Sequence, residues 1–277
     1  MLQKEEVNFV SGATRVFSIV GHPIEQVRSP EMFTTELLRR GHDAILIPIH
    51  VLPEDFGQVV PNIMKIHNLR GLLFTIPYKI AGASLADELG PQASIVGAIN
   101  ALSRRPGGGW KGEIFDGLGC VHGFLSRGVS FRGRSLMLIG AGGAGTAIGV
   151  AIAHEKPGRM RLFDTDLPRA ESLANKIRGL DPDVSVEIGE PDLEGCDVLL
   201  NASPVGMLDD ARTPISVDKL RPGLIVFDAI VKPEMTPLLA SAKRSGCAVV
   251  LGTEMMRGQI SKVVDFFEGE AAGGGHA

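Results

Sequence analysis

The first hundred residues alternate short apolar runs with stretches that have helical spacing. The apolar runs have the length and the polar flanks of buried strands, and they lie at residues 15–20, 44–50 and 71–76. Helical patterns begin near Pro30 and Pro53, where proline suits the first turn of a helix, and Ser29 is placed to cap the first of them. This alternation is typical of βαβ units and predicts a largely parallel sheet.

A second alternating series fills the later part of the chain, so the fold is predicted to be α/β with two domains. Its apolar runs predict buried strands at residues 136–139, 159–164, 197–203, 224–230 and 247–252, with helices near 168–178 and 235–245. Between the two series, one Pro and three Gly at residues 106–109 predict a hairpin loop. A helix follows from about Asp116 to Arg127, and we place the domain boundary at its start.

The last predicted helix carries an apolar stripe and is therefore expected to pack against another element. The members of the stripe recur at helical spacing and are Met256, Ile260, Val263, Val264 and Phe267. The tail GEAAGGGHA, residues 269–277, is expected to be disordered and to carry no chemistry.

Composition excludes several classes of function. A net charge of −4 without a long run of Lys or Arg gives no electrostatic footprint for nucleic acid or an anionic membrane. No apolar segment is long enough to span a bilayer, and the amino terminus lacks the pattern of a signal peptide, so a cytoplasmic protein is expected. Cys120, Cys196 and Cys247 are far apart and are expected to be buried, reduced thiols; no cluster of His and Cys predicts a metal site.

Three glycines after an apolar run predict a dinucleotide-binding loop. Gly140, Gly142 and Gly145 form a G-x-G-x-x-G motif between a predicted strand and a predicted helix. The first glycine suits a tight turn, the second lets the backbone approach a pyrophosphate, and the third lets the helix pack on the strand. The alternative is a purely structural turn between strand and helix.

Asp164 bears on which nicotinamide cofactor binds. It ends the next predicted strand, nineteen residues after Gly145, where a carboxylate can accept hydrogen bonds from the ribose hydroxyls of the adenosine. A carboxylate there would repel a 2′-phosphate, and Thr165 and Asp166 supply no arginine to pair with one. The sequence therefore favours NAD over NADP.

Lys79 is the first candidate for the chemistry, because it directly follows the predicted strand that ends at Pro77. Oxidising a hydroxyl near neutral pH needs a base, and a lysine that burial desolvates can serve as one. Asp116 could orient such a lysine. Asp116 could also merely cap the helix that follows it, and Lys79 could be an ordinary surface charge.

Five further segments, in order along the chain, resemble those of one enzyme family. They read GHPIEQVRSP (21–30), FTIPYK (74–79), VGAIN (96–100), NASPVGM (201–207) and EMMRGQ (254–259). Together with the glycine loop they resemble the shikimate dehydrogenase family, which includes the quinate/shikimate dehydrogenases. The resemblance implies a substrate domain (residues 1–116 and 252–277, with the last helix crossing back) and a Rossmann domain that binds NAD (residues 117–251), with the active-site cleft between them.

The resemblance also assigns roles to single residues. Lys79 and Asp116 are implied to act as a pair at the oxidised hydroxyl, and Asn100 and Gln259 to bind ring hydroxyls. Ser29 and Thr75 fall near the substrate carboxylate. Taken alone, Asn100 also fits a turn and Gln259 a solvated helical position. The residues expected at the cofactor are Gly140, Ala141, Gly142, Gly143, Ala144, Gly145, Asp164, Asn201, Ser203, Val205, Met207 and Gly252.

Several positions depart from the usual pattern of that family. Gln26 stands in place of a histidine, and apolar or smaller residues replace polar ones at Val27, Leu73, Ala101, Ile114, Phe115 and Val231. Losing a hydrogen bond to a charged group costs about 1.5 to 3 kcal/mol. The residues that the resemblance assigns to the reacting hydroxyl are kept, whereas several polar groups that it assigns to the acid end of the substrate have become apolar. We therefore expect that catalysis is retained while the preference for shikimate has drifted.

The sequence thus predicts an oxidoreductase that moves hydride between NAD and a ring hydroxyl of shikimate, quinate or a related cyclic hydroxy acid. Two alternatives stay open: an NAD-dependent dehydrogenase of an unrelated small alcohol, and a non-catalytic NAD-binding regulatory protein. The oligomeric state is also open, with a homodimer as one candidate.

Overall fold

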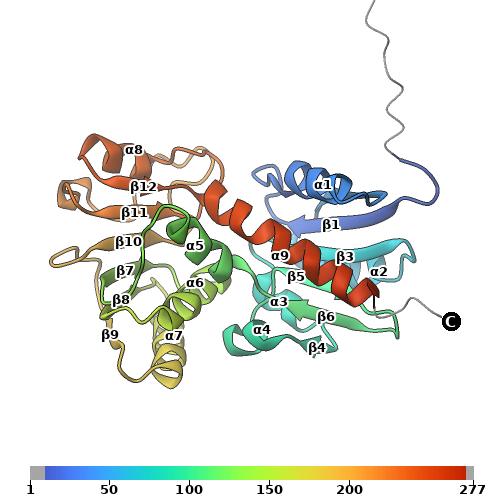
Figure 1. Cartoon of the computed structure of the whole chain (residues 1–277), viewed down its shortest axis with the longest axis horizontal. Helices are drawn as coiled ribbons and strands as arrows, with labels where there is room; N and C mark the ends of the chain where they lie inside the picture. Colours follow the sequence, from blue (N-terminus) through green and yellow to red (C-terminus); the bar gives the residue numbers. More distant parts are fainter. Residues whose placement is uncertain (1–9, 273–277) are drawn as a thin grey trace, which may run out of the picture.

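The structure is a computed structural model that describes residues 10–272, and it contains two six-stranded sheets joined by two helices (Figure 1). The first sheet has the strand order β2-β1-β3-β5-β6-β4. Its strands are β1 (Arg15–Gly21), β2 (Ala44–His50), β3 (Leu69–Phe74), β4 (Glu88–Leu89), β5 (Ala101–Arg104) and β6 (Trp110–Glu113).

This first sheet is mixed, whereas the sequence predicted a largely parallel one. Strand β1 pairs in parallel with β2 and β3, as the βαβ pattern indicated. The predicted hairpin is present, and its strand β5 runs antiparallel to both β3 and β6. The difference has a simple cause, because a loop as short as residues 105–109 can join only antiparallel neighbours.

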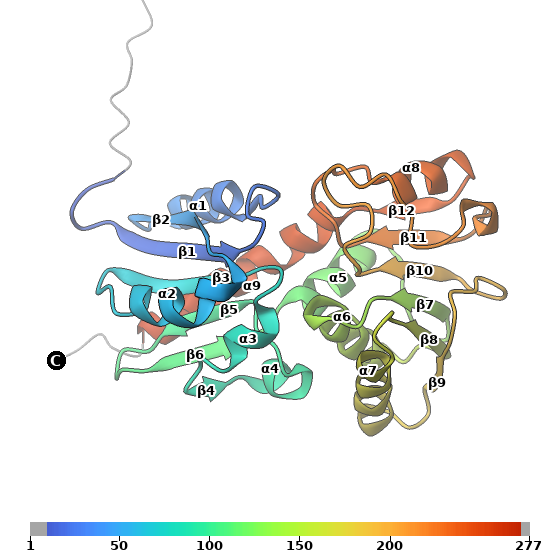
Figure 2. The ribbon, with the colours of Figure 1, turned by 180° about the vertical axis from the view of Figure 1, so that it is seen from behind.

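Helices cover both faces of the first sheet (Figures 1 and 2). Phe17 and Leu73 face the side of α1 and the last helix, while Leu72 and Phe74 face the opposite side, near α2. This alternation follows from the two-residue period of a strand. The helices of this part are α1 (Ser29–Arg39), α2 (Phe56–Ile63, after the short 3₁₀ helix η1, Pro53–Asp55), α3 (Lys79–Ala83) and α4 (Pro91–Val96).

The expected capping role of Ser29 is wrong. Arg28 occupies the N-cap position of α1, and no side chain caps the helix. The helix begins one residue earlier than the proline suggested, so Ser29 lies inside its first turn. Its side chain is buried and is free to line a cavity instead.

The second sheet is wholly parallel and has the order β12-β11-β10-β7-β8-β9. This is the order of a Rossmann fold, in which ligands bind where the direction of winding reverses, between β7 and β10. Its strands are β7 (Ser135–Ile139), β8 (Arg159–Phe163), β9 (Ser185–Ile188), β10 (Val198–Asn201), β11 (Ile225–Asp228) and β12 (Ala248–Val250), and its helices are α6 (Gly143–His154), α7 (Leu167–Leu180), α8 (Pro237–Arg244) and the 3₁₀ helix η2 (Val217–Lys219).

Two helices, α5 (Asp116–Leu125) and α9 (Gly252–Ala272), connect the sheets. Glycines let them pack closely: a Cβ on Gly117 would clash with the carbonyl oxygen of Ala147 in α6, and one on Gly119 with that of Met255 in α9. Helix α9 then runs across the first sheet, drawn in red in Figure 1. Its Phe267 ring packs on Phe17 at a centroid distance of 4.8 Å, so the predicted apolar stripe does pack on another element.

Other expectations can be compared with the described residues. Helix α9 continues to Ala272, so disorder predicted from residue 269 is wrong for 269–272, and residues 273–277 lie outside the described part. The three cysteines are free and buried, as expected. Within residues 10–272, none of the helices combines the length and the hydropathy that crossing a membrane requires.

Candidate active site

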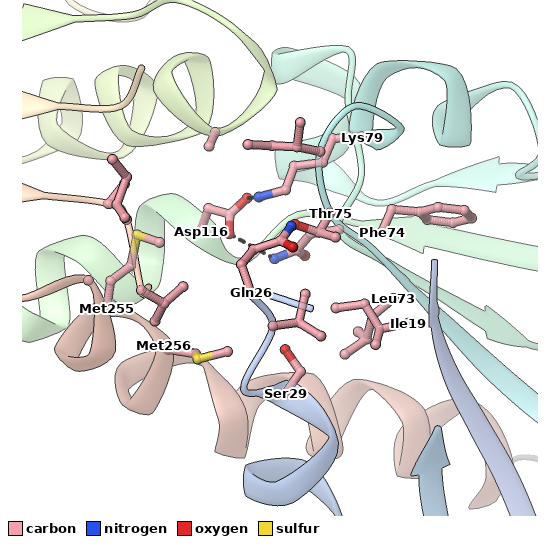
Figure 3. A pocket seen from close by; sticks show the side chains of 18 of the residues that line it. Ile19, Gln26, Ser29, Leu73, Phe74, Thr75, Lys79, Asp116, Met255 and Met256 are labelled. Atoms are coloured by element: carbon pink, nitrogen blue, oxygen red, sulfur yellow. Dashed lines mark hydrogen bonds and ion pairs between the residues drawn. The ribbon is translucent and has the colours of Figure 1, made fainter. Parts of the chain in front are cut away.

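A cavity lies between the two sheets and receives side chains from both (Figure 3). Its volume is about 1010 Å³, including the space open to solvent. The first sheet contributes the loop after β1, the end of β3 and the start of α3. The second contributes the loops after β10 and β11, and the helices α5 and α9 close it from the side.

Lys79 is fixed in this cavity by the turn that precedes it. The backbone N–H of Tyr78 donates to the carbonyl of Thr75 at 2.8 Å, which closes the turn after β3. The Tyr78 hydroxyl donates to the carbonyl of Val51 at 2.6 Å and holds that turn against the sheet. The N–H of Ile99 donates to the carbonyl of Lys79 at 2.8 Å, so the lysine backbone is also tied to the segment before β5.

Asp116 forms an ion pair with Lys79 through Oδ2, although 37 positions separate them in the chain. Its other oxygen, Oδ1, accepts a hydrogen bond from Asn100 Nδ2 at 3.2 Å. Asp116 is only 2% exposed and lies in the first turn of α5, where the helix dipole favours negative charge. It does not cap the helix, because Phe115 takes the N-cap position.

Asn100 joins the ion pair to α9. Its Nδ2 donates to Gln259 Oε1 at 2.8 Å, and its Oδ1 accepts from the backbone N–H of Phe115 at 3.0 Å. The backbone N–H of Phe74 donates to its carbonyl at 2.9 Å. Four side chains that are far apart in the sequence therefore meet in one buried hydrogen-bonded group: Lys79, Asn100, Asp116 and Gln259.

The glycine loop lies beside this group. Gly140 has a φ of +94°, and a Cβ there would lie 2.7 Å from the backbone nitrogen of Ser203. A Cβ on Gly145 would clash with the carbonyl oxygen of Gly140, as expected where a helix packs on a strand. A Cβ on Gly143 would lie 3.0 Å from the Cβ of Lys79, so the start of α6 borders the lysine directly.

Gly142 differs from these three glycines, because no atom of the described residues lies within 4 Å of a Cβ placed on it. It occupies the N-cap position of α6, where backbone N–H groups and the helix dipole attract phosphate. The space beside Gly142 is open, and the methyl group of an alanine would occupy part of it. The loop thus fits the pyrophosphate of a dinucleotide.

Asp164 lies at the end of β8, next to the same loop. Its Oδ2 accepts from the backbone N–H of Ala141 at 2.7 Å, and its Oδ1 accepts from that of Asp166 at 2.9 Å. Arg169 follows in the first turn of α7 and pairs with Asp166 at 3.1 Å. The carboxylate is therefore held at the edge of the glycine loop.

Asn201, one of the residues expected at the cofactor, has a buried side chain that bonds within the protein. It is 0% exposed, and its Oδ1 accepts from the N–H and the hydroxyl of Ser203 at 3.0 and 2.7 Å. Its Nδ2 donates to Asp228 Oδ1 at 3.1 Å. Asn201 therefore shapes the loop after β10, and Ser203 and Met207 of that loop reach the cavity.

Asp228 is a buried carboxylate that sequence reasoning missed. Burial raises its pKa to about 7, while hydrogen bonds from Thr236, Ile230 and Asn201 act in the opposite direction. The Thr236 hydroxyl donates to Oδ2 at 2.7 Å and the Ile230 N–H donates to Oδ1 at 3.1 Å. The carboxylate thereby ties together the loops that follow β10 and β11. An acidic residue at the end of an apolar strand was the available signal.

The apolar substitutions noted in the sequence divide into two groups. Val27, Leu73 and Val231 line the cavity, so they change its wall directly. Ala101, Ile114 and Phe115 are not among its lining residues. The Phe115 ring packs on Phe266 of α9 at a centroid distance of 5.6 Å.

The predicted site residues divide in the same way. Those that line the cavity are Ser29, Thr75, Lys79, Asn100, Asp116, Ala144, Ser203, Met207, Gly252 and Gln259. Those outside its lining are Gly140, Ala141, Gly142, Gly143, Gly145, Asp164, Asn201 and Val205. Sequence reasoning missed the lining residues Phe33, Lys232, Met255 and Met256, whose side chains read as ordinary core or surface positions.

Comparisons with known proteins agree with this architecture. A family model described as the shikimate dehydrogenase substrate binding domain matches residues 19–102. The shikimate dehydrogenase (NADP(+)) of Rubrobacter xylanophilus is 31% identical over 252 residues, covering 89% of this chain and 88% of that protein. The chain belongs to the shikimate dehydrogenase family. As a member of it, the chain is an NAD(P)-dependent oxidoreductase, which confirms the class expected from the glycine loop.

Two solved structures of similar proteins contain ligands. The shikimate 5-dehydrogenase of Listeria monocytogenes, in complex with shikimate and NAD, has a TM-score of 0.80 and 28% identity, covering 94% of this chain and 93% of that one. The quinate dehydrogenase of Corynebacterium glutamicum, in complex with NAD, also has a TM-score of 0.80, with 27% identity, covering 92% of this chain and 94% of that one. The two-domain α/β fold predicted from the sequence is thereby confirmed.

Proposed function

We propose that this chain transfers hydride between a nicotinamide cofactor and a ring hydroxyl of shikimate, quinate or a related cyclic hydroxy acid. One observation carries the proposal: the Lys79–Asp116 pair lies in a cavity directly beside the glycine loop. A proton-handling pair next to a dinucleotide loop is what the oxidation of a hydroxyl requires.

The roles of the side chains follow from their contacts. A nicotinamide cofactor held by the glycine loop would supply the acceptor for the hydride of the carbinol carbon, or its donor in the reverse direction. During oxidation Lys79 takes up the hydroxyl proton as the neutral amine and becomes the ammonium that pairs with Asp116, and during reduction the ammonium donates that proton. Asp116 keeps the amine in place by the ion pair and accepts a hydrogen bond from the reacting hydroxyl. Asn100 and Gln259, which are hydrogen-bonded to each other, bind a neighbouring hydroxyl.

We assign the two halves of the reaction to two parts of the chain. Residues 1–116 and 252–277 would bind the substrate, because the polar group and most apolar walls of the cavity come from them. Residues 117–251 would bind the cofactor through the glycine loop, Asp164 and the loop after β10. Gly252, at the start of α9, would lie at the junction.

Within NAD(P), we propose a preference for NAD. The support is Asp164, whose carboxylate is held beside the loop by two backbone N–H groups, and Arg169, which is already paired with Asp166. A 2′-phosphate would meet negative charge without a free partner among these residues. The name of the Rubrobacter relative gives NADP(+) for that protein, so the preference needs direct measurement.

The test is a matrix of steady-state assays that follow the absorbance of the reduced nicotinamide. Shikimate, quinate, their amino analogues and simple cyclic alcohols are each combined with NAD and with NADP. Turnover of a ring hydroxy acid supports the proposal. Turnover of simple alcohols alone would contradict it. A higher kcat/KM with NADP than with NAD would remove the role given to Asp164.

A dehydrogenase of another small alcohol is the second candidate, and one observation favours it. Val27, Leu73 and Val231 make the wall at the expected acid end of the substrate apolar. The same matrix separates the two candidates, because the second requires that the carboxylate of the substrate contribute nothing to kcat/KM.

A further inference from the structure

Gln26 is the one lining residue of the cavity with a buried side-chain atom that lacks a partner among the described residues. The residue lies in the loop between β1 and α1 and is 4% exposed. Its Oε1 makes no hydrogen bond within the described part of the chain. Buried carbonyl oxygens are almost always paired, so an unpaired one on a cavity wall needs an explanation.

The orientation of the amide is fixed by its other end. Gln26 Nε2 donates to the carbonyl oxygen of Pro23 at 2.7 Å. A backbone carbonyl can only accept, so the NH₂ end must face Pro23 and the oxygen must face away from it. Figure 3 shows the Gln26 side chain directed into the cavity, on the same side as Thr75 and Asp116.

None of the neighbouring polar groups of the described residues donates to this oxygen. Lys79 Nζ is paired with Asp116, and Asn100 Nδ2 serves both Asp116 and Gln259. Much of the remaining wall is apolar and includes Val27, Phe33, Leu73, Val231 and Met256. A bound molecule is therefore the natural source of a donor.

We propose that Gln26 is a specificity-determining residue whose Oε1 accepts a hydrogen bond from a hydroxyl or amino group of the substrate, other than the hydroxyl that is oxidised. This inference rests on the proposed function and names the chemistry of a second recognition point in the same site. A carboxylate is excluded from this point, because two acceptors would face each other without a proton between them.

The same contact constrains where an acid group of the substrate lies. Two of the described lining residues are cations, Lys79 and Lys232, and the first is committed to Asp116. Lys232 is exposed at the rim, where its Nζ donates to the carbonyl of Glu25 at 3.3 Å. The substrate therefore presents a donor to Gln26 Oε1, and its carboxylate binds elsewhere in the cavity.

The experiment pairs deletions in the protein with deletions in the substrate. Gln26→Leu removes the acceptor, and Gln26→Glu keeps an acceptor while losing the donor to Pro23. Each is assayed with the best ring substrate and with analogues in which one hydroxyl that is not oxidised is replaced by hydrogen. Gln58→Leu, at an exposed position of α2, is the matched control.

The expected result is a coupling between one hydroxyl and Gln26. Its removal lowers kcat/KM of the wild-type enzyme by about 10-fold, the loss expected for one net hydrogen bond. With Gln26→Leu the same removal changes kcat/KM by less than about 2-fold, while Gln26→Glu retains the discrimination. A substrate with an amino group in place of that hydroxyl should have a higher kcat/KM with Gln26→Glu than with the wild-type enzyme.

Two outcomes would overturn the inference. One is that Gln26→Leu lowers kcat/KM for all analogues by the same factor, as a purely structural role through Pro23 predicts. The other is that no hydroxyl shows coupling. Failure of the proposed function looks different, because the wild-type enzyme would then turn over none of the compounds. In that event, calorimetric binding of the same compounds to the same variants tests Gln26 by the same coupling.

Discussion

Lys79 and Asp116 meet in a partly buried ion pair although they come from different elements, one from the start of α3 and the other from the start of α5. The pair depends on three connections: the turn that holds Lys79, the bond from Asn100, and the close packing of α5 on α6 and α9. Asp116 is only 2% exposed, so the surrounding packing holds its carboxylate beside the Lys79 amine.

Asp116→Asn should lower kcat strongly and leave the binding of the cofactor intact. The amide keeps the shape of the side chain and can still accept from Asn100, but it no longer pairs with the Lys79 ammonium. Losing a positioned proton-handling group costs about 10²- to 10⁴-fold in rate. Stopped-flow fluorescence of the bound cofactor would check that its affinity changes little. A fall in cofactor affinity equal to the fall in kcat would mean that the variant is misfolded.

Substitutions in the glycine loop should separate binding from stability. Gly142→Ala should weaken the binding of NAD(P) and leave the free energy of unfolding unchanged, because a Cβ there meets no atom of the described residues and the backbone φ of −68° suits alanine. Gly145→Ala should cost about 1 to 3 kcal/mol in stability, because the added Cβ meets a backbone carbonyl.

Urea denaturation and cofactor titration measure the two effects independently. Gly179→Ala is the matched control, since this glycine lies on the exposed side of α7, with no described atom near an added Cβ. If Gly142→Ala bound the cofactor as tightly as the wild-type chain, the loop could not be the pyrophosphate site.

Val27→Ser combined with Val231→Tyr should raise kcat/KM for shikimate. Both residues line the cavity, and each substitution adds a hydroxyl that can donate to a carboxylate. A hydrogen bond to a charged group contributes about 1.5 to 3 kcal/mol, or roughly 10- to 100-fold in kcat/KM. Val217→Ser, at an exposed position of η2, is the control. An unchanged kcat/KM would show that the wall formed by Val27 and Val231 does not face the carboxylate.

Asp228→Asn should remove one source of pH-dependent stability. In the unfolded chain this carboxyl has its ordinary pKa of 3.8, and burial raises the folded value to about 7. Between these values the folded state holds a proton that the unfolded state has released, so the free energy of unfolding falls as pH rises, and this loss is complete above about pH 7.

The side chain of asparagine does not ionise in this pH range, and its oxygen can still accept hydrogen bonds from Ile230 and Asn201. The stability of Asp228→Asn relative to the wild-type chain should therefore increase between about pH 5 and pH 8 when both are measured by urea denaturation. Because the variant and the wild-type chain have all other carboxyl groups in common, the effects of these groups cancel in the difference between the two free energies of unfolding. Two curves that stay parallel across this range would contradict the raised pKa.

The glycine loop and the strand pattern were predictable because their signals are local. A G-x-G-x-x-G motif constrains its own turn, and an apolar run constrains its own strand. The short helices α3 and α4 were missed, because five or six residues are too few to show a helical period. Strand β9 was missed because its side chains are only half-buried at the edge of the sheet.

The sequence indicated which residues form the site, but it did not indicate how their side chains are oriented. Aligned motifs indicated that Lys79 and Asp116 belong together, but no pattern indicated that Phe115 turns toward Phe266. The same holds for Gln26, whose orientation depends on the carbonyl of Pro23. Asn201 is a further case, since its motif indicated a place in the loop after β10 but did not indicate that its side chain is buried.

The proposed reaction depends most directly on proton transfer by Lys79, and Lys79→Ala tests this role. Because removing the amine leaves the buried Asp116 carboxylate without its cation, the double variant Lys79→Met with Asp116→Asn serves as a fold control. Lys65→Ala, on the exposed surface after α2, controls for the loss of a lysine. The measurement is kcat with the best ring hydroxy acid beside the dissociation constant of NAD(P). The account predicts that kcat falls by at least about 10²-fold while the dissociation constant is nearly unchanged. Turnover at the wild-type rate by Lys79→Ala would contradict it.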